Sequence, residues 1–462
     1  MIPPVTRPTR YAGTPVLFAR PADTPLRLLV LADTIQGDPA LDLLWLLGRD
    51  KAVTVLATGD TPEWLPASSV ELGIRDDEAD QMLVTIDGPS GGLHGVSPAS
   101  RWEEQAQADA RDDPSVDFEA RRRLLFQGAV GADVADLTIT NDPYLLGLAS
   151  GPLQQSSVMQ PRDAIAVIGL YLRRHRRYLR QAHGLLVDSS GFFYFYASRA
   201  VLPTAWRWIG ACLASGLDSL ANLCWSPILR LDRVLRARDR MQFELWGSFG
   251  RPRADEVLFY FDVVLLMLTA AFDGVARVVH HSYNLGKDGF DAGWQKRERW
   301  LPKLTSAGGG SLASIVDRGT DGAALIDLLT KLRNEVHGEP PRATTNLSEE
   351  TVSLEVPSNA EQTVQESIKH FGGDWGYTPY GVSSASLDPG RFIEALLPRA
   401  IDLLNELMEA NDFSRLGVDT TTILHSPPED QSFGTEAARD LRRLAGLDLP
   451  RRWLAYWQPV DE

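Results

Sequence analysis

Three residues near position 335 have the types and the spacing needed for chemistry on a phosphodiester. In the run LRNEVHGE, Arg333 and His337 stand four residues apart within a helical pattern. Four residues make about one helical turn, so the two side chains share a face. Histidine can move a proton near neutral pH, and the planar guanidinium group of arginine pairs with phosphate oxygens. Asn334 can hold a phosphate oxygen or orient the histidine. This chemistry needs no metal. The alternative is a solvated helix end with good capping.

A second group consists of acidic residues near the ends of apolar runs in the N-terminal half. The run RLLVLAD ends at Asp33, and the segment ADLTITNDPYLL carries Asp136 and Asp142. Asp117 and Glu119 stand at the start of the helical pattern that precedes this segment, and either could be a further acid of the group. Carboxylates that converge at strand ends can hold a divalent cation, which activates water and clamps a phosphate. The alternative is that these acids only cap helices and turns.

The third feature is a cluster of arginines in the pattern LRRHRRYLRQ. On a continuous helix, Arg173, Arg176, Arg177 and Arg180 follow one face, with tyrosines between them. Such a stripe can track a phosphate backbone, so these arginines are nucleic-acid-binding candidates. An arginine-rich face can also be a solvated surface or pair with acids across a domain interface.

The elements that must position these residues fall into parts of different character. Residues 1–190 alternate apolar runs with helical patterns, which predicts an α/β domain. Residues 191–411 predict an all-α bundle with a polar insert at 339–389, and residues 412–462 a loop-rich tail. The long helical patterns of the bundle cover Thr204–Leu223, Pro227–Leu245, Ala254–Tyr283, Gly322–His337 and Arg391–Ala410.

Composition limits the partners and the compartment of the chain. Its 462 residues include 46 Lys and Arg against 61 Asp and Glu, a net charge of -15, so any contact with RNA must be local and salt-sensitive. Cys212 and Cys224 stand among apolar residues, which indicates buried thiols in a reducing cytoplasm. Asp262 and Asp273 interrupt the most apolar run, which favours a core helix over a membrane span. We therefore expect a cytoplasmic protein without a membrane partner.

The C-terminal part resembles the HEPN superfamily of helix bundles. The resemblance rests on LRNEVHGE and on the preceding helix FYFDVVLLMLTAAFDGVARVVHHS, and it covers about residues 253–337 and 391–410. HEPN proteins carry an arginine–polar–histidine motif late in a helix, and many are ribonucleases or nuclease-derived toxins. The resemblance implies a homodimer with a composite site and no cofactor. In that site His337 would act as general acid or base, Arg333 would stabilise charge on the phosphate, and Asn334 would position them.

The N-terminal part resembles PIN-like nuclease domains. In those domains a strand ends in Thr-x-Asp followed by leucines, and Asp136, Thr140 and Asp142 carry the match here. Asp33 matches the first acid of the family. The resemblance implies that Mg or Mn is held by Asp33, Glu119, Asp136 and Asp142. A degenerate PIN-like domain or another Rossmann-like domain is the alternative.

The two resemblances predict an RNA-cleaving or RNA-binding protein of a bacterial toxin or defence type. Catalysis would make it a ribonuclease of the HEPN type. The alternative is a non-catalytic dimeric binding or regulatory module built from degenerate nuclease-like domains. In that case the insert at 339–389 would be an interaction surface for a protein partner that the sequence does not identify.

Overall fold

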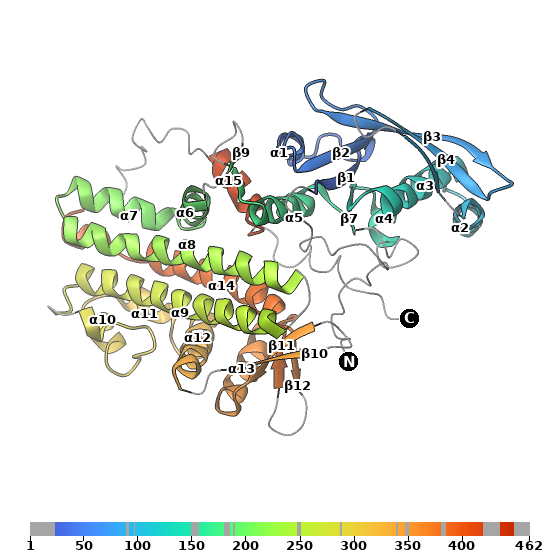
Figure 1. Cartoon of the computed structure of the whole chain (residues 1–462). Coiled ribbons are helices and arrows are strands. Elements are labelled where there is room, and N and C mark those ends of the chain that lie inside the picture. Colours follow the sequence, from blue (N-terminus) through green and yellow to red (C-terminus); the bar gives the residue numbers. More distant parts are fainter. Residues whose placement is uncertain are drawn as a thin grey trace. The chain divides into compact units, whose positions relative to one another are not determined.

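The fold is described from a computed structural model that covers most of the chain (Figure 1). It describes residues 24–88, 92–96, 98–148, 157–179, 185–187, 190–246, 251–286, 289–338, 341–346, 351–379, 385–418 and 435–447. These residues form two compact units, which meet along the chain between Arg177 and Tyr178. The sequence places the boundary near residue 190. Each unit is described by itself.

A seven-stranded sheet with a parallel centre forms the first unit. Its spatial order is β5-β4-β3-β2-β1-β6-β7. The five strands β3, β2, β1, β6 and β7 run parallel to one another. Beyond β3, the strands β4 and β5 extend the sheet as antiparallel neighbours. This confirms the α/β class of the N-terminal part. The strands are β1 (Leu26–Leu31), β2 (Val53–Thr58), β3 (Ala67–Asp76), β4 (Gln81–Asp87), β5 (Gly92–Val96), β6 (Leu137–Ile139) and β7 (Ser157–Met159).

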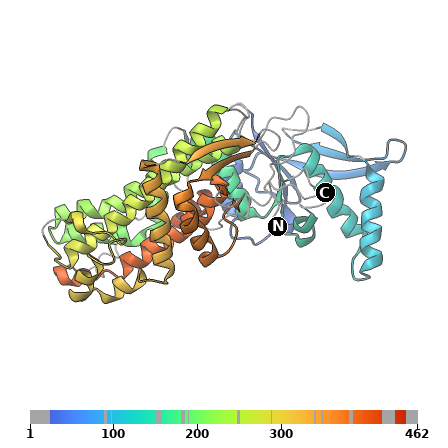
Figure 2. The same ribbon diagram turned by 90° about the horizontal axis from the view of Figure 1, so that it is seen from below.

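Helices cover both faces of this sheet. Leu29 and Leu31 of β1 belong to a core shared with α2 (Ala99–Asp112) and α3 (Phe118–Val134). The alternate side chains of Leu28 and Val30 point to the opposite face and are also fully buried. Outside that core, α1 (Leu41–Gly48) contacts β2, and α5 (Pro161–Arg174) contacts α1 and β6. Burial on both faces explains why β1 is apolar at nearly every position. In Figure 2, α2 lies beside the β3–β4 ribbon.

The second unit is mainly helical and contains three long helices. Figure 1 shows α8 (Asp218–Trp246), α9 (Arg251–Ser282) and α14 (Pro389–Glu409) side by side. α12 (Asp321–His337) packs against α9. This confirms a helical C-terminal region. The shorter helices are α6 (Ser190–Val201), α7 (Pro203–Ala214), α10 (Leu301–Ser306), α11 (Gly310–Ile315), α13 (Ser358–Phe371) and α15 (Thr435–Leu444).

Two helix boundaries differ from the sequence prediction. The pattern Thr204–Leu223 is not one helix, because α7 ends at Ala214 and Gly216 takes a φ of +71°, a conformation that favours glycine. The prediction that a helix begins at Pro227 is also wrong, since α8 runs through this proline. Packing of α8 along α9 outweighs the backbone hydrogen bond that proline cannot donate.

The insert contains strands that the sequence does not predict, and the tail contains helical segments. Four short strands of the insert form an antiparallel sheet in the order β10-β11-β13-β12, so the second unit is not all-α. The predicted loop-rich tail contains α15, which packs against α6. The strands are β10 (Arg342–Asn346), β11 (Thr351–Val356), β12 (Tyr377–Pro379) and β13 (Ala385–Leu387). A separate pair, β8 (Arg177–Leu179) and β9 (Leu185–Val187), follows α5 in the chain.

A buried ion pair connects three helices of the second unit. Arg238 of α8 and Glu394 of α14 are 4% and 2% exposed, and the guanidinium group holds the carboxylate through two contacts of 2.5 and 2.6 Å. Gln242 donates a third hydrogen bond to Glu394, at 3.0 Å. Arg238 also donates to the backbone carbonyl of Ala445, just after α15, at 2.6 Å. A cation at the carboxyl end of a helix is favourable for the helix dipole.

α9 contains the most apolar stretch of the second unit. Within the described ranges it is the one helix long and apolar enough to cross a membrane, and half of its most apolar window is buried in the structure. It packs against α8, α12 and α14, as a core helix does. The two cysteines are buried and free, as the sequence predicts.

We expect Arg238→Met to lower the free energy of unfolding of the helical unit by about 3–5 kcal/mol, because Glu394 stays buried without its partner. Denaturant unfolding followed by tryptophan fluorescence measures this. The double variant Arg238→Met/Glu394→Leu should recover most of the loss, because neither charge remains. Arg240→Met, at an exposed position of the same helix, should change stability by less than about 0.5 kcal/mol. An equal loss in both single variants would contradict the role of the pair.

Stability should also depend on pH through Asp262 of α9. Its Oδ1 atom is buried without a hydrogen-bond partner among the described residues, and burial raises its pKa from 3.8 to about 6. A carboxyl whose pKa is raised by folding binds its proton more tightly in the folded state. Its contribution to stability is therefore lost as pH rises from 3.8 to about 6.

Asp262→Asn removes this penalty. After allowance for solvent screening, we expect it to stabilise the protein by about 1 kcal/mol at pH 7, and the gain should vanish toward pH 4. Denaturant unfolding at several pH values measures the difference, and Asp255→Asn, at an exposed position of the same helix, should show no such trend. A gain that is independent of pH would argue against the buried carboxyl as its cause.

Candidate functional site

The motif predicted to be catalytic lies on the last turn of α12. The helix begins after Thr320, whose hydroxyl accepts a hydrogen bond from the backbone N–H of Ala323 at 3.1 Å, and Gly338 follows its last residue. One face of the helix is buried in the unit, and the polar residues occupy the remaining face. The buried leucines are Leu325, Leu328, Leu329 and Leu332.

All three motif residues are exposed to solvent at this end. Arg333 Nη1 donates a hydrogen bond to Asn334 Oδ1 at 3.1 Å. Arg333 and His337 lie one turn apart, and within the described ranges His337 has no hydrogen-bond partner. A histidine buried in the bundle could not reach a substrate. Its exposure leaves the imidazole able to exchange a proton with a bound molecule.

The charge of Arg333 reaches the neighbouring helix α9. Burial raises the pKa of Asp273 on α9, and the positive charges of Arg277 and Arg333 oppose that rise. On the other side of the motif, Lys331 forms an ion pair of 3.1 Å with the buried Glu335. Arg333 therefore lies close enough to Asp273 for its positive charge to lower the pKa of that carboxyl.

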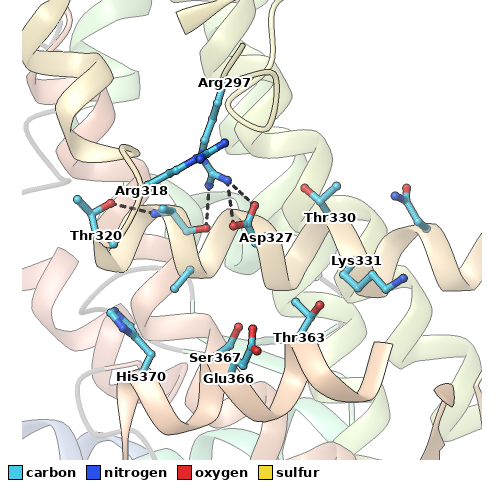
Figure 3. A pocket seen from close by; sticks show the side chains of 14 residues that line it. Arg297, Arg318, Thr320, Asp327, Thr330, Lys331, Thr363, Glu366, Ser367 and His370 are labelled. Carbon is cyan, nitrogen blue, oxygen red and sulfur yellow. Dashed lines mark hydrogen bonds and ion pairs between the residues drawn. The ribbon is translucent and has the colours of Figure 1, made fainter. Parts of the chain in front are cut away.

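A polar groove of about 540 Å³ follows α12 and includes Asn334 (Figure 3). Arg297 reaches α12 from one side, where it holds Asp327 at 2.8 and 2.9 Å and donates to the carbonyl of Ala323 at 3.0 Å. Helix α13 forms the other side. The sequence does not indicate this groove, because α13 belongs to the insert and its contact with α12 is tertiary. Its polar lining from α13 consists of Thr363, Glu366, Ser367 and His370.

In the first unit, Asp33 and Asp142 lie at the carboxyl edge of the parallel strands. Asp33 lies two residues after the end of β1, and Asp142 caps α4 (Pro143–Leu148), where its Oδ1 accepts from two backbone N–H groups at 3.0 Å. β2 lies on one side of β1 and β6 on the other, so the strand order reverses here. Ligands of open α/β sheets bind outside the carboxyl ends at such a switch point.

Thr140, which carries part of the PIN-like match, joins the loops at this edge together with Thr34, Asp38 and Asn141, which the sequence did not indicate. The hydroxyls of Thr34 and Thr140 share a hydrogen bond of 2.8 Å. Asn141 Nδ2 donates to Asp38 Oδ2 at 2.9 Å. The loops after β1 and β6 are therefore cross-linked by side chains rather than by backbone pairing. The acid-bearing turn after each strand is the sequence signal that could have indicated this contact.

The other two acids predicted as metal ligands lie elsewhere. Asp136 precedes β6 at the opposite edge of the sheet, where its Oδ2 accepts from the backbone N–H of Arg27 at 2.7 Å. Glu119, in the first turn of α3, pairs with Arg122 at 2.8 Å. No group of three or more acidic, histidine or cysteine residues in the described ranges could hold a metal ion. The structure therefore does not fit a four-carboxylate site, and a Mg or Mn site at Asp33 and Asp142 stays a prediction.

The predicted arginine stripe does not form along one helix face. α5 ends at Arg174, Arg173 is buried, and Arg176 takes a φ of +57°, which ends the helix. Arg177 lies in β8 and pairs with the buried Asp50 at 2.6 Å. The expectation of a single basic helix face is wrong, because the turn at Arg176 redirects the chain. Arg180 lies outside the described residues.

Comparison with known proteins identifies no relative of this chain. No protein-family model matches the chain, and neither a curated protein nor a solved structure is significantly similar to it. The PIN-like and HEPN-like assignments therefore stay proposals.

The contact between Gly59 and Asp33 gives a test of the switch-point geometry. A methyl group on Gly59 would overlap the Asp33 carboxylate, and Gly59 has a φ of +85°. Gly37 has a similar φ of +77° with no atom within 4 Å of such a methyl group. We expect Gly37→Ala to cost about 1–2 kcal/mol from the backbone alone, and Gly59→Ala to cost measurably more. Denaturant unfolding compares them. Equal costs would show that Asp33 can move away freely.

Proposed function

We propose that this protein cleaves RNA at the last turn of α12, with Arg333, Asn334 and His337 acting without a metal. The observation that carries the proposal is the exposure of Arg333 and His337, one turn apart at the end of a helix whose other face is buried. Burial of that face fixes the helix, while the exposed face stays available to a substrate.

The residue types supply the parts that cleavage of a ribonucleotide chain requires. His337 takes the proton of a ribose 2′-hydroxyl, and the 2′-oxygen then forms a bond to the adjacent phosphorus. The bond from phosphorus to the 5′-oxygen breaks, and that oxygen leaves with a proton. The products are a 2′,3′-cyclic phosphate and a free 5′-hydroxyl. Arg333 stabilises the negative charge that develops on the phosphate oxygens.

Asn334 orients Arg333. Its carbonyl oxygen accepts from Arg333, which leaves its Nδ2 group to donate to a phosphate oxygen. The proton for the leaving 5′-oxygen needs a second acid. In a homodimer formed through the helical unit, the His337 of a second copy would supply it, in accord with the HEPN resemblance. A cytoplasmic toxin or defence role is the corresponding biological proposal.

The experiment measures cleavage of a labelled single-stranded RNA by the full chain in the presence of EDTA. We expect Arg333→Ala and His337→Ala each to lower the rate at least a hundredfold, because each removes a group used in the transition state. Asn334→Ala should lower it less. The products of the wild-type reaction should end in a cyclic phosphate.

Arg299→Ala is the matched control, since it removes an exposed arginine outside α12, and it should leave the rate unchanged. Circular dichroism should report the same helix content for every variant. If Arg333→Ala and His337→Ala cleave RNA as the wild type does, the proposal is overturned and a non-catalytic binding module is favoured. Loss of all cleavage in EDTA would instead direct attention to Asp33 and Asp142.

A further inference from the structure

We infer that the groove between α12 and α13 binds the sugar–phosphate backbone of single-stranded RNA and leads it to Asn334. This inference rests on the proposed function, because it gives the substrate of the motif a path. The groove runs along α12 from Thr320 to Asn334, fourteen residues, or about 21 Å of helix. Its volume of about 540 Å³ lies within the range of ligand-binding sites.

Hydroxyl groups without protein partners line the groove. In the part of the chain that the structure describes, the side chains of Thr330, Thr363 and Ser367 form no hydrogen bond. Ser367 is only 5% exposed, and in Figure 3 it points from α13 towards α12. These hydroxyls can therefore donate to or accept from the polar groups of a ligand that enters the groove.

The charges of the groove suit a backbone with widely spaced phosphates. Arg318, at the amino-terminal end of α12, is 81% exposed, and its ion pair with Glu298 spans 3.7 Å between two exposed side chains. Such a pair contributes little and is easily exchanged for a phosphate. Lys331, which is paired with Glu335 at 3.1 Å, lies near the other end of the groove. Between these cations, Arg297 and Asp327 neutralise each other.

Ribose is the sugar that these side chains fit. A 2′-hydroxyl can both donate and accept hydrogen bonds, as can Thr330, Thr363 and Ser367. The exposed carboxylate of Glu366 adds an acceptor for a ribose hydroxyl and would repel a phosphate placed beside it. Alanines are the only apolar side chains of the lining, so the groove offers no pocket for the large apolar anchors of a bound peptide.

The test measures binding separately from cleavage. Fluorescence anisotropy follows a labelled single-stranded RNA of mixed sequence titrated with the full-length His337→Ala variant. Thr363→Glu places a negative charge in the groove, and we expect it to weaken binding at least tenfold. Gln365→Glu adds the same charge to an exposed position of α13 outside the groove, and binding should change less than twofold. DNA of the same sequence should bind at least fivefold more weakly.

Salt dependence gives a second measurement that does not disturb a half-buried position. With about two phosphate contacts, the slope of log K against log salt should be about -1.4, and Arg318→Met should reduce its magnitude by about 0.7. Arg299→Met, the matched exposed arginine, should leave the slope unchanged.

Failures of the two proposals are distinguishable. If RNA does not bind, or if Thr363→Glu and Gln365→Glu bind equally and Arg318→Met keeps the slope, the groove inference is overturned, whatever the cleavage assay shows. If His337→Ala still cleaves RNA while the groove variants lose binding, the catalytic assignment fails and the groove stands. Equal affinity for RNA and DNA would also overturn the inference, because the groove would then not recognise ribose.

Discussion

The buried contact between Arg238 and Glu394 is the interaction on which the helical unit most depends. Two charges out of water are tolerated only when their hydrogen-bonding capacity is used, and here Gln242 and the carbonyl of Ala445 complete the set. These hydrogen bonds fix the positions of α8, α14 and the end of α15 relative to one another. α9 packs along α8, and α12 packs on α9, so the motif helix is held indirectly by the same charges.

Sequence periodicity predicted the elements whose signals are local. The helical pattern Gly322–His337 matches α12 to within one residue, and the acid after the apolar run places Asp33 close to the end of β1. The sequence did not predict at which end of the parallel strands Asp136 lies. β6 has only three residues, so acids at its two ends resemble one cluster in the sequence but lie at opposite edges.

Nonlocal contacts account for the rest of what the sequence did not predict. The helix predicted beyond Arg174 ends because Arg176 takes a left-handed conformation, for which the basic pattern gave no signal. The groove along α12 depends on α13, whose docking position follows from the small sheet of the insert. Pattern analysis finds faces of helices, whereas a groove is a property of two faces together.

Asn334 belongs both to the motif at the end of α12 and to the lining of the groove. Its carbonyl oxygen holds Arg333, while the same side chain lines the groove. A molecule that turns this amide on entering the groove also redirects the guanidinium group. If both proposals hold, occupancy of the groove and the orientation of Arg333 are linked through the side chain of Asn334, without any movement of the helices.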